Sequence, residues 1–102
     1  MAVYITPIKQ YIIDAVTAFR IKNNINQSQL AIVLEVERGF VSNVESGGQR
    51  ATYNFTHLNA IAFYFDVPIS TFLPEKALPK EEIPKKSQGQ GGKERPDKNN
   101  KA

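Results

Sequence analysis

The chain has 102 residues, of which 41% are hydrophobic, with no cysteine, one histidine and a formal net charge of +3. This length suits one domain, and the composition excludes disulfide bonds, thiolate metal sites and a cysteine nucleophile. No apolar run approaches the ~20 residues of a membrane span, and the N-terminus does not resemble a signal peptide. We therefore expect a cytoplasmic protein that binds no membrane, metal or cofactor and is not an enzyme.

The first part of the predicted helical body holds two helices. Thr6 is expected to cap the first helix, with Pro7 at its first position, because proline is tolerated where the backbone N–H has no helical partner. Apolar residues then recur at helical spacing to about Lys22. Asn26 is expected to cap a second, short helix over residues 27–34.

Three more helices follow in the predicted order. The third covers residues 38–46 and should stop at Gly47, since glycine commonly follows the last helical turn. Asn54 caps the fourth helix, and Ser70 caps a last short turn that we count as the fifth. No strand is expected, because the apolar stretch at residues 3–5 is short and terminal. The predicted inner face of the fourth helix consists of Phe55, Leu58, Ile61, Ala62 and Phe65.

The positive net charge lies entirely in the C-terminal part of the sequence. Residues 1–73 hold five basic and five acidic groups, whereas residues 74–102 hold eight basic and five acidic ones. The second range also carries four of the six prolines and no aromatic residue, so it is predicted to be a disordered tail. Either this tail is only solvated, or it acts as a basic arm that lies along phosphates.

The segments 27–34 and 38–46 have the outline of a helix-turn-helix. The second of these helices needs only Val41, Val44 and part of Phe40 for its inner face. The residues left for its outer face are Arg38, Gly39, Ser42 and Asn43. A short helix with few inward residues can stand out from the body and enter the major groove of DNA, whose width admits one helix.

Two sequence blocks carry a family resemblance. A Gln-x-x-Leu-Ala block begins at Gln27, and a Val-x-x-Val-Glu-x-Gly block runs from Val41 to Gly47. Together, at this separation, they resemble the Cro/cI-type helix-turn-helix family, also called the xenobiotic-response-element (XRE) family, over residues 8–73. The resemblance implies a compact, all-α, five-helix lambda-repressor-like domain in residues 1–73. It also implies a sequence-specific, repressor-like transcriptional regulator that binds double-stranded DNA as a homodimer.

The resemblance assigns roles to individual positions. Bases would be read by Arg38, Gly39, Phe40 and Asn43, and phosphates would be held by Asn26, Gln27, Arg50, Thr52 and Tyr53. Arginine can donate to O6 and N7 of guanine, and asparagine can pair with N6 and N7 of adenine. The N-terminus of the second helix offers free N–H groups to a phosphate. Glu45 resembles a structural residue, Phe40 is expected to be partly buried, and His57 is expected at the surface or its boundary.

Three residues depart from the family pattern. Glu35 stands where glycine is usual, and a left-handed backbone there would cost about 1 kcal/mol. Glu37 stands where a small N-cap is usual, and near DNA it would either be repelled by phosphates or accept from a cytosine amino group. Gly39 places no side chain at a principal reading position. These departures weaken the expected reading of sequence more than they weaken the fold.

Other functions remain open for the same residues. A protein-interaction module on this fold, with weak or no DNA reading, is favoured by the zero net charge of residues 1–73 and by the acids Glu35 and Glu37. In an antitoxin, residues 74–102 would order on contact with a toxin partner. An enzyme is disfavoured, because acid–base or nucleophilic catalysis needs a cluster of reactive groups.

Overall fold

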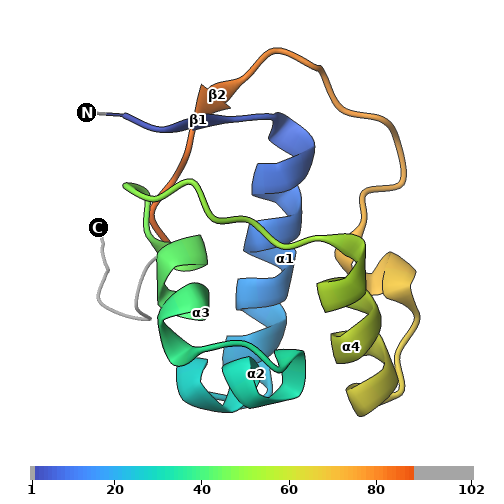
Figure 1. Cartoon of the computed structure of the whole chain (residues 1–102). Helices are drawn as coiled ribbons and strands as arrows, with labels where there is room; N and C mark the ends of the chain where they lie inside the picture. The colour runs from blue at the N-terminus through green and yellow to red at the C-terminus, as the bar shows by residue number, and fades with distance from the viewer. Residues whose placement is uncertain (1, 89–102) are drawn as a thin grey trace, which may run out of the picture.

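The computed structural model describes residues 2–88, which form a bundle of helices with a short antiparallel strand pair at one end (Figure 1). The elements in chain order are β1 (Tyr4–Ile5), α1 (Pro7–Lys22), α2 (Gln27–Leu34), α3 (Arg38–Glu45), α4 (Phe55–Phe65), the 3-10 turn η1 (Ile69–Phe72) and β2 (Ile83–Pro84). The four α-helices lie where the sequence predicts them, and α3 ends one residue earlier than expected.

The prediction of a fifth helix is wrong, since the described residues hold four α-helices and the last segment is the 3-10 turn η1. The chain leaves α4 through Asp66, which is left-handed, and Pro68 is the extended residue before η1. Only four residues are helical in η1, a length typical of a 3-10 connector. The turn still buries Phe72 completely, which closes the core between α1 and α4.

The central element is α1, which has α3 on one side and α4 on the other in Figure 1. Thr6 is extended and Pro7 occupies the first turn, as predicted, although the Thr6 side chain makes no capping hydrogen bond. The helical spacing of its apolar residues places Ile12, Ile13 and Val16 in the core. This helix is therefore the surface against which the other elements pack.

Two asparagines cap α2 and α4, as the sequence predicts. Asn26 Oδ1 accepts from the N–H of Gln29 at 2.7 Å, and the Gln29 side chain accepts from the N–H of Asn26 in return. Asn54 and His57 make the same reciprocal pair at the start of α4. These capping boxes satisfy backbone N–H groups that a helix leaves unpaired, and so they fix where each helix begins.

The core lies where α1, the α2–α3 pair, α4 and η1 meet. Phe19 of α1 packs edge-on against Phe65 and Phe72, with ring centroids 5.2 and 5.3 Å away. The predicted inner face of α4 is confirmed for Leu58, Ile61 and Ala62, which are buried, and in part for the half-buried Phe65. It is wrong for Phe55, which is exposed because it is the first residue of α4 and the buried stripe begins one turn later.

Residues 74–88 fold back onto the helices, so the prediction of a disordered tail is wrong for this range. Figure 1 shows the segment passing from η1 over one end of the bundle to the N-terminal strand. There β2 pairs with β1, with Ile83 opposite Ile5 and Pro84 opposite Tyr4. The expectation of no strand is wrong here, because a two-residue strand is too short to show alternation in sequence, and the fold is mostly helical rather than all-α. Residues 89–102, the rest of the predicted tail, lie outside the described part.

Replacing Glu35 with glycine is expected to raise the free energy of unfolding by up to about 1 kcal/mol. Glu35 ends α2 in the left-handed conformation, with φ 60° and ψ 43°. Glycine has no Cβ to strain there, although its more flexible unfolded chain offsets part of the gain. Chemical denaturation measures the change. Asn24→Gly is the matched control, since Asn24 has φ 58° but asparagine tolerates this conformation; an equal gain in the control would contradict the interpretation.

Candidate nucleic-acid interface

The helices α2 and α3 pack against each other and are joined by residues 35–37, as a helix-turn-helix requires. The inner side of α3 buries Val41, Val44 and Glu45. The exposed residues of α3 are Arg38, Gly39, Ser42 and Asn43. The predicted division of this helix into an inner and an outer face is therefore confirmed.

The outer face of α3 is open at Gly39, where an added Cβ would have no heavy atom within 4 Å. Ser42 is already engaged, because its hydroxyl donates to the Gly39 carbonyl at 3.2 Å. Arg38 and Asn43 remain as the exposed side chains with the donors that reading a base edge requires.

A polar pocket of about 280 Å³ lies between the start of α2 and the start of α3. Its lining residues are Arg20, Asn26, Gln27, Ser28 and Arg38. The N-terminus of α2 contributes free N–H groups and the positive end of the helix dipole, and Arg38 adds a guanidinium. The structure thus brings the predicted phosphate residues Asn26 and Gln27 next to a predicted base reader.

A buried ion pair joins α1 to α3 behind this pocket. Arg20 Nε and Nη2 each donate to a carboxylate oxygen of Glu45 at 2.9 Å. Arg20 Nη1 donates to the Ile25 carbonyl, and Gln27 Nε2 donates to Glu45 Oε1, both at 2.9 Å. The carboxylate therefore ties the end of α3 to α1 and to the start of α2. One of the two donors that Gln27 could offer to a phosphate is used inside the protein.

The family resemblance implied a structural role for Glu45, but its partner Arg20 was not predicted. A signal was present, since Arg20 comes four residues after the buried Val16 and so lies on the same side of α1. A basic residue on a core-facing stripe needs an acid to pair with, because an unpaired buried charge is strongly unfavourable. Glu45, on the inner side of α3 beside Val41 and Val44, has the complementary charge.

Phe40 is half-buried, as predicted, and packs against two aromatic rings outside α3. Its ring centroid lies 5.0 Å from that of His57 and 6.1 Å from that of Tyr53. The contact attaches the start of α3 to α4 and to the loop before it. Phe40 is thus more a support for the outer face than one of its exposed readers.

The loop 46–53 carries three residues that were predicted to bind phosphate, and these residues differ in how exposed they are. Arg50 is exposed and Thr52 is half-buried. Tyr53 is only 5% exposed, and its hydroxyl is buried without a hydrogen-bond partner. Burial, with the Glu45 carboxylate as a second cause, raises the pKa of Tyr53 well above its usual value. A phosphate contact is therefore open to Arg50 and Thr52, whereas the hydroxyl of Tyr53 faces the interior.

Lowering the pH is expected to destabilise the fold through His57. Its Nδ1 accepts from the Asn54 N–H at 3.0 Å, which requires the neutral ring, and burial lowers the pKa of His57 below the usual value for histidine. The stabilisation is therefore fully present above about pH 6.5 and is lost as the pH falls below it. The loss should be up to about 1 kcal/mol, the size of a capping interaction.

The measurement is the free energy of unfolding at about pH 8 and about pH 5, where histidine changes charge. His57→Gln is the matched variant, because glutamine at this position can still accept from the cap but does not titrate. The wild-type chain should lose more stability than the variant between the two pH values. Equal losses would show that His57 does not carry the pH dependence.

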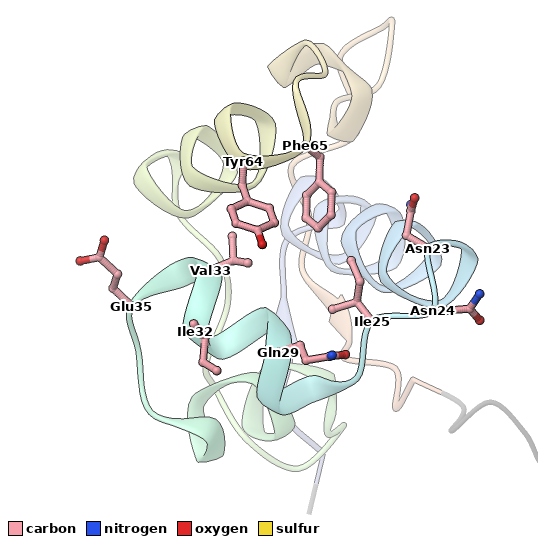
Figure 2. A pocket seen from close by; sticks show the side chains of 9 residues that line it. All are labelled: Asn23, Asn24, Ile25, Gln29, Ile32, Val33, Glu35, Tyr64 and Phe65. Carbon is pink, nitrogen blue, oxygen red and sulfur yellow. The ribbon is translucent and has the colours of Figure 1, made fainter.

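A groove of about 550 Å³, lined by both apolar and polar side chains, lies between α2 and the end of α4 (Figure 2). In Figure 2, Tyr64 and Phe65 of α4 face Val33 and Ile25 across the groove. The full lining comprises Asn23, Asn24, Ile25, Gln29, Ile32, Val33, Glu35, Tyr64 and Phe65. Ile32 is 76% exposed and Tyr64 is 66% exposed, and clustered exposed apolar side chains often mark a contact surface. The groove was not predictable from sequence, since its walls come from separate helices.

Comparison of the chain with protein-family models, with curated proteins and with solved structures gives no match. Within residues 2–88, no helix is long and apolar enough to cross a membrane. In the same range no three histidine or carboxylate side chains come together as a metal site would need. The α2–α3 pair and the residues on its surface are therefore the features that bear on function.

Proposed function

We propose that the chain is a sequence-specific DNA-binding transcriptional regulator of the XRE type that inserts α3 into the major groove. The observation that supports this most is the exposed face of α3, with Arg38 and Asn43 beside the polar pocket at the start of α2. DNA reading needs two kinds of contact: phosphate contacts that position the protein and base contacts that specify the sequence. The end of one helix suits a phosphate, and the neighbouring helix face can reach the bases.

Each exposed group has a chemical counterpart on DNA. Arg38 can donate two hydrogen bonds to guanine, and Asn43 can exchange two with adenine. The missing side chain at Gly39 lets the backbone of α3 come close to the base edges. A phosphate in the pocket would accept from the free N–H groups of α2, and Arg50 offers a second contact to the sugar–phosphate backbone.

A homodimer is part of the proposal. One helix reads only about 4–6 base pairs, so two copies are needed for a site of useful length. Half-sites about 34 Å apart, one turn of DNA, would then form an inverted repeat.

The test is selection of random duplex DNA on the full chain at low and at moderate salt. We expect an enriched inverted repeat at both salt concentrations. Asn43→Ala should weaken binding to the selected duplex roughly five- to 150-fold, the cost of one two-bond base contact. Asn59→Ala, which removes an exposed asparagine from α4, is the matched control and should bind like the wild-type chain.

A second candidate is a protein-interaction module, with an antitoxin as one version of it. Two observations favour it: the zero net charge of residues 1–73 and the exposed apolar side chains of Ile32 and Tyr64 at the groove between α2 and α4. For the antitoxin version, residues 83–88 are hydrogen-bonded to the body, so a toxin that bound them would have to displace them. Absence of any enriched duplex in the selection would favour this candidate over DNA reading.

A further inference from the structure

Residues 83–88, which we call the strap, are the last residues that the structure describes. They link the N-terminal strand to α3. The strap pairs with β1, crosses α1 and reaches the C-terminal end of α3. Its backbone donates from Lys85 to Val3 O at 2.7 Å, from Lys86 to Gln10 Oε1 at 2.9 Å and from Gln88 to Glu45 O at 2.8 Å. A segment distant in sequence is thus bonded to the helix that carries the candidate base readers.

Lys85 is the most deeply placed residue of the strap, with 6% of its surface exposed. Its ammonium donates to three backbone carbonyls: Asn43 O at 3.2 Å, Gln49 O at 2.6 Å and Ala51 O at 2.9 Å. An ammonium has three N–H donors, so every donor has an acceptor. Burial lowers the pKa of Lys85, and the three carbonyls offset the cost of removing the charge from water.

These contacts supply what α3 lacks locally. The helix has eight residues, contains Gly39, and its N-cap Glu37 makes no side-chain hydrogen bond. At its other end, Ser46 is extended rather than left-handed, so the usual glycine cap is absent. Lys85 and Gln88 donate to two of the last carbonyls instead, and the ammonium also suits the negative end of the helix dipole.

Gly47 has a different role from the predicted helix stop. A Cβ at this position would lie 3.0 Å from the backbone nitrogen of Ser87 and 3.3 Å from Lys85 O. The glycine therefore allows the close approach of the strap, and an added Cβ would require the strap backbone to shift by a few tenths of an ångström, whereas a Cβ at Gly48 would meet only Ser46 Oγ at 3.8 Å.

We infer that Lys85 is a positioning residue for DNA binding, which holds the C-terminal end of α3 and the loop at 49–51 in the orientation that the interface needs. This inference rests on the proposed function. Asn43, a candidate base reader, lends its carbonyl to Lys85, and Arg50 lies between the two loop residues whose carbonyls Lys85 also binds. The orientation of the candidate interface therefore depends on the strap, which binds the backbone of Asn43 and of the loop at 49–51.

The test compares full-length Lys85→Met with Lys86→Met. Both lose one positive charge, but Lys86 is exposed and only its backbone is bonded. Amide hydrogen exchange should become about tenfold or more faster in residues 38–53 of Lys85→Met while α1 keeps its protection, because local opening needs less free energy when local bonds are lost. Binding to the selected duplex should fall about tenfold or more, as expected for a displaced recognition helix. Lys86→Met should change neither quantity by more than about twofold.

Gly47→Ala and Gly48→Ala form a second pair that leaves the strap residues unchanged. Gly47→Ala should push the strap from α3 and reproduce the local exchange increase, whereas Gly48→Ala should not. Unchanged exchange in residues 38–53 of both Lys85→Met and Gly47→Ala would overturn the inference, as would an equal increase over the whole chain. Faster local exchange with unchanged DNA affinity would also overturn it. If the wild-type chain selects no duplex, the proposed function fails, and the positioning role in DNA binding fails with it whatever the exchange shows.

Discussion

Glu45→Ala is expected to lower the free energy of unfolding by about 3–5 kcal/mol, the largest stability effect that we predict. Glu45 is 2% exposed, and Arg20 opposite it is 8% exposed. Removing the carboxylate leaves the guanidinium buried without a counter-charge, and it also removes an acceptor from Gln27. Equilibrium denaturation with urea measures the loss.

Two controls separate the buried charge from the lost side chain. Glu37→Ala removes an exposed acid just before α3 and should change stability by no more than about 0.5 kcal/mol. The double variant Arg20→Met with Glu45→Leu replaces both charges by apolar groups and should recover much of the stability, because no charge is then left unpaired. A single variant that costs less than about 1 kcal/mol would show that water or another group compensates Arg20.

The helices were predictable because their signals are local. The caps at Asn26 and Asn54 act within three residues, and apolar spacing of three and four residues decides which side of each helix is buried. The sequence left open whether Glu35 is left-handed, and the structure shows that it is, so the turn geometry outweighs a strain of about 1 kcal/mol. In each case the interacting groups lie within one or two helical turns of each other.

The place of Lys85 was not predictable, because its partners are remote backbone carbonyls, which leave no signal in the side chains. Lys85 binds carbonyls from residues 34 to 42 positions earlier, and every residue type has a carbonyl. In sequence it is one more lysine in a range rich in proline and charge, where disorder is the ordinary prediction. The burial of Lys85 could come only from the packing of the whole chain.

In the candidate interface, too, some features follow from local sequence and others only from the packing of the whole chain. The exposure of Arg38 and Asn43 followed from the helical period and the inner positions of Val41 and Val44. The burial of the Tyr53 hydroxyl could not be predicted in this way, since loop residues have no regular period. The family resemblance in sequence implied instead that Tyr53 contacts DNA. Side chains on the outer face of α3 are therefore the ones whose roles are most directly testable.

Arg38→Ala should weaken binding to the selected duplex by about 1–3 kcal/mol, or roughly five- to 150-fold, and relax the preference at one base position. Arg38 is exposed, so the free energy of unfolding should stay within about 0.5 kcal/mol of the wild-type value. Filter binding of the selected duplex and of single-base variants measures both the affinity and the preference.

Arg38 lies both on the outer face of α3 and in the polar pocket, and Arg38→Lys separates the two roles. Lysine keeps the charge that a phosphate needs but cannot donate the paired bonds that distinguish guanine. If Arg38 reads a base, Arg38→Lys should lose the base preference almost as fully as Arg38→Ala does. If Arg38 binds only phosphate, lysine should restore affinity for every sequence alike, and the salt dependence should return to that of the wild-type chain. The second result would leave Asn43 as the principal reader and would make α3 a helix of low sequence specificity, which agrees with the absence of a side chain at Gly39.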